Sequence, residues 1–333
     1  MRRFLKDCCY ALAATLATQS IARLPRKVAL SIGASFGTTV FNLASRHRAL
    51  VYKQLAVSLE LEDEREVEQL ARRCFQNLGK NLIEFMQLPR MARIGSENSL
   101  PQESGVGTPS HSGNTASQES GVGTPSHNGN TVSQISRIVS FEGGEYIAQA
   151  LAEGNGAIIL TGHFGNWELL AASIVAEGYT LRPLARRLRS KRLNVLLNAY
   201  RERAGYTGID RDGGIRGALR CLKQNALLGI LADVDTKIDG VFVDFFGRPA
   251  YTPYSPVAIA LKTGAPILPT FIIRQPDDSH RVIVEPPLAL EQSGDKQHDF
   301  VVNTQKFTKV IESYVRLYPE QWVWMHERWK TQP

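Results

Sequence analysis

Gly162-His163-Phe164-Gly165-Asn166-Trp167-Glu168-Leu169 is the stretch that decides how this chain folds. The apolar run Ala157–Leu160 leads into it and the apolar run Leu169–Ala172 follows, which predicts a buried strand, a tight turn and a helix. The turn then presents His163 at the end of a strand and Glu168 in the first turn of a helix. A histidine beside a carboxylate can take a proton from a hydroxyl, because the carboxylate fixes the imidazole tautomer and stabilises the imidazolium.

Two other interpretations compete with a catalytic pair. A histidine and a nearby glutamate are often only a pair of surface residues without a catalytic role. Zinc is the second alternative, but His-x-x-x-x-Glu is not His-Glu-x-x-His, and no nearby cysteine or second histidine supplies further ligands. We therefore expect no metal and no cofactor. The remaining histidines are scattered along the chain: His47, His111, His127, His280, His298 and His326.

Beyond residue 137, short apolar runs alternate with helical patterns. The expected strands are Ala157–Gly162, Leu181–Leu184, Leu227–Leu231, Gly240–Phe245, Ile267–Ile273 and His280–Glu285. The expected helices are Glu142–Glu153, Asn166–Glu177, Ser190–Ala204, Gly214–Lys223, Ser255–Lys262 and Asp299–Leu317. This alternation predicts an α/β fold, with a mostly parallel central sheet flanked by helices and the site at the strand ends.

The chain divides into four segments. Residues 1–50 are expected to form membrane-anchoring helices, and residues 51–98 a helical segment that packs on the catalytic domain, with an amphipathic helix over 62–90 closed by Pro89. Residues 99–136 contain a 16-residue tandem repeat, Glu103–Gln118 and Glu119–Gln134, which lacks apolar side chains to bury and is expected to be disordered. Residues 137–333 form the α/β domain.

Positive charge is concentrated in two parts of the chain, whose net charge is +7. Residues 1–53 hold nine Lys and Arg against one acid, and residues 182–220 hold eleven against three. No nucleic-acid-binding motif accompanies them, so we expect two acidic partners and no specific nucleic acid. The four cysteines, Cys8, Cys9, Cys74 and Cys221, make no disulfide framework, which favours free thiols in a reducing compartment.

The basic N-terminal segment allows several interpretations. It resembles a signal peptide, and it could also form a spanning helix, a pair of helices lying in the membrane interface, or core helices of the domain. The basic residues between its two apolar runs favour an uncleaved anchor at the cytoplasmic face of a membrane.

The motif around His163 resembles the His-x-x-x-x-Asp/Glu block of the lysophospholipid acyltransferase superfamily. Its Gly-Asn-Trp-Glu form is similar to the bacterial lipid A late (lauroyl/myristoyl-type) acyltransferases. The resemblance covers residues 20–98 weakly and 138–333 strongly. It continues in order through Arg182–Leu184, Arg201–Gly205, Gly229–Asp233, Gly240–Ala250, Gly264–Pro269 and Tyr318–Lys330.

The resemblance implies a glycerolphosphate-acyltransferase-like fold and an activity. A fatty acyl chain would pass from an acyl thioester, carried by acyl carrier protein or coenzyme A, to a hydroxyl of a lipid A-type glycolipid at the cytoplasmic face of the bacterial inner (plasma) membrane. His163 would be the general base and Glu168 would orient it. Direct transfer needs no covalent intermediate, in keeping with a sequence without a Gly-x-Ser-x-Gly elbow.

Further residues are candidates for stabilising the oxyanion and for binding the acceptor. Arg201, or Arg203 beside it, could stabilise the oxyanion, as could backbone N–H groups near Gly165 and Asn166. Both arginines could equally lie on a solvated helix face. Asp233 ends an apolar strand and is a further candidate catalytic residue, which could hold an arginine or the acceptor. The family's Asp-Gln is Asp-Val here, which leaves no counterpart for that glutamine.

The remaining candidates concern substrate binding. Arg186 and Arg187 belong to a basic cluster suited to an acidic acyl carrier protein or to a lipid phosphate, or to a solvated surface. Phe246 and Gly247 could line the acyl or acceptor site, although simple core packing is equally compatible.

Three other functions stay open. The acceptor could be another glycolipid or a lysophospholipid. The same His–Glu pair could activate water in a hydrolase, which product analysis without acceptor would reveal. A basic peripheral protein that only binds lipid is the non-enzymatic alternative, and it would retain its function after His163→Ala.

Overall fold

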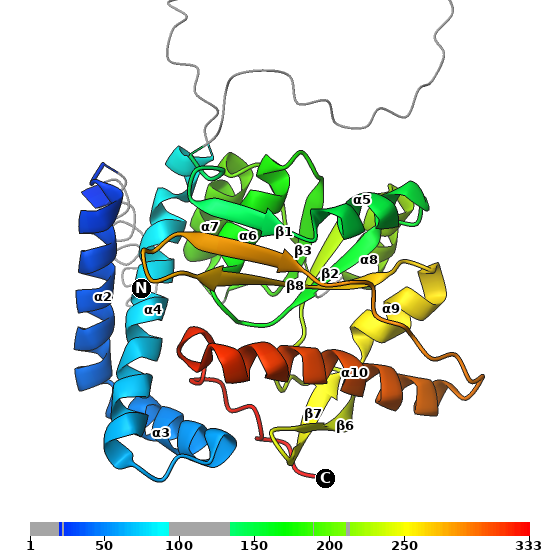
Figure 1. Ribbon diagram of the computed structural model, residues 1–333. Coiled ribbons are helices and arrows are strands. Elements are labelled where there is room, and N and C mark those ends of the chain that lie inside the picture. Colours follow the sequence, from blue (N-terminus) through cyan, green and yellow to red (C-terminus); the bar gives the residue numbers. More distant parts are fainter. Residues whose placement is uncertain (1–19, 22, 93–133, 189, 211–213) are drawn as a thin grey trace, which may run out of the picture.

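A seven-stranded sheet forms the centre of the computed structural model, which describes residues 20–21, 23–92, 134–188, 190–210 and 214–333 (Figure 1). The strand order is β1-β9-β8-β2-β5-β3-β4, and only β8–β9 pairs antiparallel. The predicted α/β fold with a mostly parallel sheet is therefore confirmed. The strands are β1 Val139–Glu142, β2 Ala157–Thr161, β3 Leu181–Ala185, β4 Ile209–Asp210, β5 Leu227–Leu231, β8 Ile267–Arg274 and β9 His280–Val284.

Helices cover both faces of this sheet because its central strands are apolar on both sides. In β2, Ile158 and Leu160 pack with α8 (Gly214–Lys223), α9 (Ser255–Thr263) and α10 (Lys296–Leu317). The alternate residues, Ala157 and Ile159, pack with α5 (Gly144–Ala152) and α6 (Trp167–Ala176) on the other face. Two buried faces leave only the strand ends open for a site.

The predicted strand Gly240–Phe245 forms, but outside the main sheet. As β6 it pairs antiparallel with β7 (Arg248–Pro253) in a separate hairpin, with Phe245 opposite Arg248. Phe246 and Gly247 make the turn, with φ of 57° and 70°. The sequence pattern missed β7, β1 and β4, because four-residue and two-residue strands and a proline-flanked strand carry little periodic signal.

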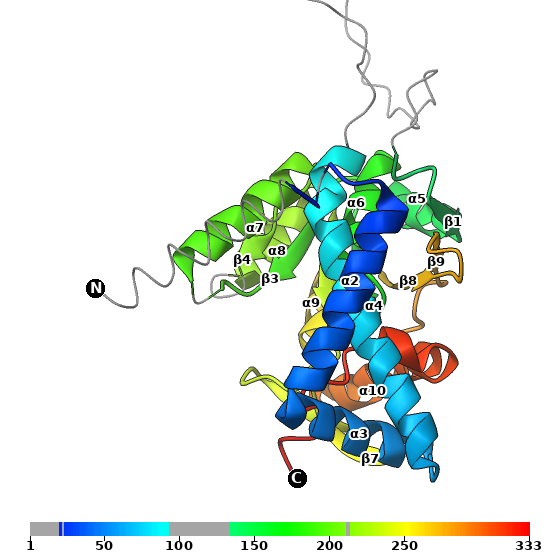
Figure 2. The ribbon, with the colours of Figure 1, turned by 90° about the vertical axis from the view of Figure 1, so that its left-hand side faces the viewer.

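Within the described residues, three helices precede the sheet: α2 (Arg26–Leu43), α3 (Ser45–Leu59) and α4 (Glu64–Met91). α2 runs alongside α4 (Figures 1 and 2), and glycines allow the close approach. A Cβ added at Gly37 would lie 2.2 Å from the carbonyl oxygen of Phe75. α4 continues two residues past Pro89 and ends at Met91, one residue beyond the predicted helix over 62–90. Pro89 lies in the last turn of a long helix, where one lost hydrogen bond matters little.

Membrane crossing has no single-helix candidate within the described residues. α2 and α3 satisfy the length and composition test only as a pair, and they are bent by 95° at Ala44. The disorder expected for the tandem repeat, and everything expected of residues 1–19, lie outside the described residues.

The C-terminal segment folds back on the domain. After α10 and the short helix η2 (Pro319–Gln321), Trp322 and Trp324 are each 1% exposed. Trp322 forms an antiparallel bridge with Phe164, in the turn after β2. The C-terminal tail therefore packs against the turn that carries His163.

Candidate active site

His163 and Asp233 meet at the carboxyl ends of two neighbouring parallel strands. In the pairing of β2 with β5, Thr161 lies opposite Leu231, so the residues two positions beyond them also face each other. Asp233 Oδ1 lies 2.8 Å from His163 Nδ1, and Asp233 Oδ2 accepts a hydrogen bond of 2.6 Å from the His163 backbone N–H. Trp322 Nε1 donates to the same Oδ2 at 2.7 Å.

This arrangement fixes the imidazole tautomer. Burial raises the pKa of Asp233, but its interaction with His163 and the hydrogen bonds from His163 and Trp322 outweigh burial and hold that pKa well below its usual range. An ionised carboxylate only accepts hydrogen bonds, so the ring proton sits on Nδ1. Nε2 then carries the lone pair, and it has no hydrogen-bond partner among the described residues. A base in this state is ready to accept a proton.

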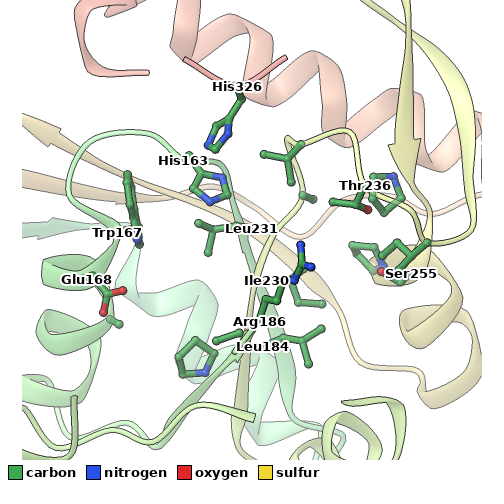
Figure 3. A pocket seen from close by; sticks show the side chains of 18 of the residues that line it. His163, Trp167, Glu168, Leu184, Arg186, Ile230, Leu231, Thr236, Ser255 and His326 are labelled. Carbon is green, nitrogen blue, oxygen red and sulfur yellow. The ribbon is translucent and has the colours of Figure 1, made fainter. Parts of the chain in front are cut away.

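Glu168 does not contact the imidazole, which corrects the expected His163–Glu168 pair. Its carboxylate accepts hydrogen bonds from Arg201 Nε at 2.9 Å, Arg201 Nη2 at 2.5 Å and Tyr206 Oη at 2.6 Å. In Figure 3 it lies on α6, apart from the ring of His163. The first turn of α6 directs Glu168 toward α7 (Lys191–Arg203), while Asp233 already occupies Nδ1.

The Glu168 cluster is a fixed charge pair with a buried hydroxyl. Burial and the neighbouring Glu168 charge raise the pKa of Tyr206 well above its usual range, so the hydroxyl keeps its proton and donates. Burial lowers the pKa of Arg201, but the hydrogen bonds and charge of Glu168 more than offset this and raise it. Both partners therefore stay in the protonation states that maintain the contact.

Gly165 and Asn166 serve the architecture of the turn. The Gly165 N–H, expected as an oxyanion donor, donates instead to the Gln321 carbonyl at 2.8 Å. Asn166 caps α6: its Oδ1 accepts from Leu169 N at 3.1 Å, and its Nδ2 donates to Glu84 at 2.8 Å. The Gly165 N–H and the Asn166 side chain are therefore occupied within the protein and are not free to bind substrate.

The predicted arginines separate into different places. Arg201 and Arg186 line the cavity beside His163. Arg187 is 71% exposed and ion-paired with Asp210 at the surface. Arg203 is exposed near the end of α7, outside the cavity.

Phe246 and Gly247 do not line this cavity, which corrects their expected role in substrate binding. Phe246 is 6% exposed and contacts the rings of Phe245 and Trp324. The hairpin turn packs under the C-terminal tail, and so the alternative of core packing describes Phe246.

The cavity beside His163 has a volume of about 560 Å³ (Figure 3). Most of its lining is apolar, from the ends of β3 and β5, the loop after β5, α7 and the start of α9. Such a wall suits an alkyl chain. The apolar side chains include Trp167, Ala171, Leu184, Leu188, Leu197, Ile230, Leu231, Val234 and Ile238.

His326 is a site residue that the sequence analysis missed. Its ring lies 4.8 Å from the ring of His163, centre to centre, and both line the cavity. Burial and the neighbouring His163 lower the pKa of His326, so its neutral form is favoured. Its only sequence signal is its place in the Tyr318–Lys330 block, because 162 residues lie between it and His163. Within the described ranges, no group of three or more metal-binding side chains forms.

The sequence analysis also missed the role of Glu84, which lies beneath the turn that carries His163. Glu84 on α4 is 0% exposed and binds Arg26, Arg274, His280 and Asn166, with the shortest oxygen-to-nitrogen distances at 2.6 Å. Its own burial raises the pKa of Glu84, but His280 and Arg274 hold it well below its usual range. A lone Glu on an amphipathic helix carries no sequence signal of this role.

With this geometry in place, comparison with known proteins identifies the family. The family model for bacterial lipid A biosynthesis acyltransferases matches residues 124–331, and the chain belongs to that family, which confirms the resemblance.

The similar relatives are named either as phosphatidylinositol mannoside acyltransferases or as acyltransferases of lipid A biosynthesis. Phosphatidylinositol mannoside acyltransferase of Mycobacterium tuberculosis (strain ATCC 25618 / H37Rv) is 34% identical over 130 residues, which are 38% of this chain and 41% of the relative. Lipid A biosynthesis acyltransferase of Haemophilus influenzae is 28% identical, over 57% of this chain and 59% of the relative. Lipid A biosynthesis lauroyltransferase of Escherichia coli (strain K12) is 26% identical, over 60% and 64%. The chain thus spans less than two thirds of the length of each.

Proposed function

We propose that this chain is an acyltransferase that moves a fatty acyl chain from an acyl thioester to a hydroxyl of a glycolipid. One observation carries the proposal: an ionised, buried Asp233 holds His163 beside a largely apolar cavity, and Nε2 of His163 has no partner in the part of the chain that the structure describes. The membership of an acyltransferase family supports it. A general base can deprotonate the acceptor hydroxyl, and the apolar cavity beside it can hold the alkyl chain of the donor.

The proposed reaction is a direct transfer. His163 Nε2 removes the proton of the acceptor hydroxyl as that oxygen attacks the thioester carbonyl, and Asp233 stabilises the imidazolium. The tetrahedral intermediate collapses with cleavage of the carbon–sulfur bond. The imidazolium returns its proton to the leaving sulfur, so a thiol and an ester are the products and the enzyme is regenerated.

Arg201 is the proposed stabiliser of charge on the carbonyl oxygen. It lines the cavity, and Glu168 and Tyr206 hold it in place. Glu168 therefore acts as a positioning residue for the guanidinium, instead of for the imidazole. A fixed cation costs little reorganisation when the oxyanion forms.

Acyl carrier protein is the proposed donor, with coenzyme A as the alternative. Arg186 and Leu188 line the cavity, and Lys191 and Val195 are exposed beside them on α7. A rim with both positive and apolar side chains suits an acidic carrier protein. We expect Lys191→Glu to raise KM for acyl carrier protein and leave KM for acyl-coenzyme A nearly unchanged, and equal effects on both would contradict this donor.

Two acceptors are in competition. A lipid A-type glycolipid follows from the family, and the 26–28% identical lipid A relatives support it. A phosphatidylinositol mannoside-type glycolipid is the second candidate, because the mycobacterial relatives reach 34% identity. Both offer sugar hydroxyls on an anionic lipid.

We further propose that α2 and α3 attach the chain to the cytoplasmic face of the bacterial inner membrane. Val28, Ile32 and Phe36 repeat every four residues on α2 and are 49%, 42% and 52% exposed. One apolar helix face turned to solvent is typical of an interfacial helix. Ile32→Ser with Phe36→Ser should release the protein from anionic vesicles in a sedimentation assay, whereas Leu317→Ser, at a still more exposed position on α10, should not. Unchanged binding of the double variant would refute this attachment.

Mass spectrometry of lipids tests the activity and the acceptor together. Wild type and His163→Ala would be expressed in a Gram-negative host that lacks its late acyltransferases, and in a mycobacterial host that lacks its mannoside acyltransferase. A gain of one acyl chain on lipid A or on the mannoside, lost in the variant, identifies the acceptor. Fatty acid release without acceptor would indicate a hydrolase, and full function of His163→Ala would indicate a lipid-binding protein without catalysis.

A further inference from the structure

A second cavity, of about 420 Å³, lies on the other side of the C-terminal tail. Its walls come from α3, the start of β7 and the tail, which lie together at one end of the molecule in Figures 1 and 2. His326 lines the first cavity, and its neighbours Glu327 and Trp329 line this one. Gln54, also in the wall, donates to the His326 carbonyl at 2.9 Å.

Arg248 is a cation without a counter-ion in this wall. Its Nη2 donates to Ser58 Oγ at 2.8 Å, and its guanidinium carbon lies 3.5 Å from the ring centre of Trp329. Burial lowers its pKa, and no carboxylate oxygen of the described residues lies within 4.0 Å of it. The Trp329 ring and Ser58 offset part of the cost of this desolvation, and a bound anion would offset more of it by supplying a negative charge.

Two buried donors in the same wall also have no acceptor. Arg248 Nε and Trp329 Nε1 are both inaccessible to solvent, and neither has a hydrogen-bond partner. Each such group carries a desolvation penalty in the folded protein. Both atoms lie beneath the surface of the wall, so a ligand would reach them only after the Arg248 and Trp329 side chains shift.

The charge of the cavity is positive overall. Lys53 and Lys330 add two exposed ammonium groups to Arg248, against the single carboxylate of Glu327. A phosphate supplies charge and several acceptor oxygens at once, and it is the usual partner of an arginine combined with lysines. A neutral or cationic ligand would leave the cations unpaired.

We propose that this second cavity binds the phosphate of a membrane-lipid headgroup, at a site separate from the acyl-transfer cavity. The position of the cavity favours a lipid over a soluble phosphate. Lys53 lies on α3, a helix without any acidic residue, which follows directly after the exposed apolar face of α2. A headgroup at this position would leave its chains on the side of α2 and α3.

Tryptophan fluorescence of the purified full-length protein tests the proposal without any acyl transfer. The probes are dihexanoyl phosphatidic acid, which is soluble, with inorganic phosphate and dihexanoyl phosphatidylcholine as comparisons. We expect a saturable change with phosphatidic acid at concentrations where the other two give none. The change should be absent in Trp329→Phe and present in Trp167→Phe, which alters the first cavity.

Variants of the basic residues then measure the affinity by calorimetry. Arg248→Gln should weaken phosphatidic acid binding on the order of tenfold, since it removes a charged donor from a desolvated wall. Lys53→Gln with Lys330→Gln should weaken it by about fivefold for each charge. Both lysines are exposed, so this pair keeps the test valid if Arg248→Gln fails to fold. The control Lys262→Gln, on exposed α9 surface, should bind as wild type.

Three outcomes would overturn the proposal. No saturable change with phosphatidic acid rejects the site. Wild-type affinity in Arg248→Gln and in the lysine pair places the lipid elsewhere. Equal affinity for inorganic phosphate rejects the assignment to a lipid headgroup. None of these outcomes depends on catalysis, so an inactive protein could still pass the test and an active one could fail it.

Discussion

Asp233 decides the chemistry of the site at the scale of single residues. His163 and Asp233 were both predicted as catalytic from the sequence, but the sequence could not pair them, because 69 residues lie between them. The pairing depends on the register of β2 and β5, which only the folded sheet defines. Glu168, five positions from His163, was the nearer candidate and is bound elsewhere.

Asp233→Asn should lower kcat by roughly 10²- to 10⁴-fold with little change in KM. An asparagine amide facing His163 Nδ1 would donate to it, so the ring proton would move to Nε2 and the base would be lost. Steady-state acyl transfer by the purified variant measures this.

The matched control is Glu168→Gln, which keeps the imidazole contacts intact. We expect it to act through Arg201, with a smaller loss of kcat than in Asp233→Asn. A larger loss of kcat in Glu168→Gln than in Asp233→Asn would instead support the hypothesis that Glu168 orients His163.

Gly162→Ala should separate His163 from Asp233. A Cβ at Gly162 would lie 2.8 Å from Asp233 Oδ2, so the carboxylate would have to shift away from His163. We expect a loss of kcat on the order of tenfold or more, because small misplacements of catalytic groups have large effects. Gly144→Ala is the control: a Cβ there meets nothing within 4 Å, and activity should be unchanged. Normal kcat in Gly162→Ala would show that the contact tolerates displacement.

At the scale of elements, the predictions succeeded where the apolar pattern was long. β5, β6 and α8 have the predicted ends, and most others differ by one or two residues. The arrangement of these elements was harder to predict. The pattern of β6 does not say that it leaves the main sheet for a hairpin, because its alternation of buried and half-buried residues fits either.

Glu84 joins the elements around the site turn. It connects α4 to α2 through Arg26, to β8 and β9 through Arg274 and His280, and to the start of α6 through Asn166. If Glu84 loses its charge, the guanidinium groups of Arg26 and Arg274 lose their buried carboxylate partner.

Glu84→Gln should lower the free energy of unfolding by about 3–5 kcal/mol, the usual effect of breaking a buried ion pair on one side. Urea denaturation measures this. Glu68→Gln, on the same helix, breaks only an exposed pair with Arg72 and should have little effect. Equal stabilities of the two variants would mean that Glu84 is dispensable.

At the scale of the whole molecule, several buried titratable groups favour the same pH range. Burial lowers the pKa of His280 and of His326 below the ordinary value of 6.5. The unfolded chain therefore binds protons at both positions before the folded chain does, and stability falls as the pH is lowered through about 6.5. Glu84 and Asp233, with lowered pKa values, stabilise the fold above their ordinary pKa values and lose that contribution only in stronger acid.

Unfolding measured from about pH 8 to about pH 5 should show a decreasing free energy, with a slope of at most about 1.4 kcal/mol per pH unit for each of the two histidines. His326→Gln should remove one of these contributions and flatten the curve. A free energy of unfolding that stays constant over this range would contradict the direction of both pKa shifts.

The sequence by itself determined the α/β class, the strand–turn–helix around His163, the family, and the place of His163 in the site turn. These depend on local periodicity and on short motifs, which neighbouring residues define. Only the tertiary structure decided that Asp233 binds His163, that Glu168 binds Arg201, that His326 and Glu84 belong to the site and its support, and that a second, basic cavity lies behind the tail. All of these are contacts between residues far apart in the chain, and they depend on strand register, on the packing of α4 and on the return of the C-terminal segment, which local sequence does not specify.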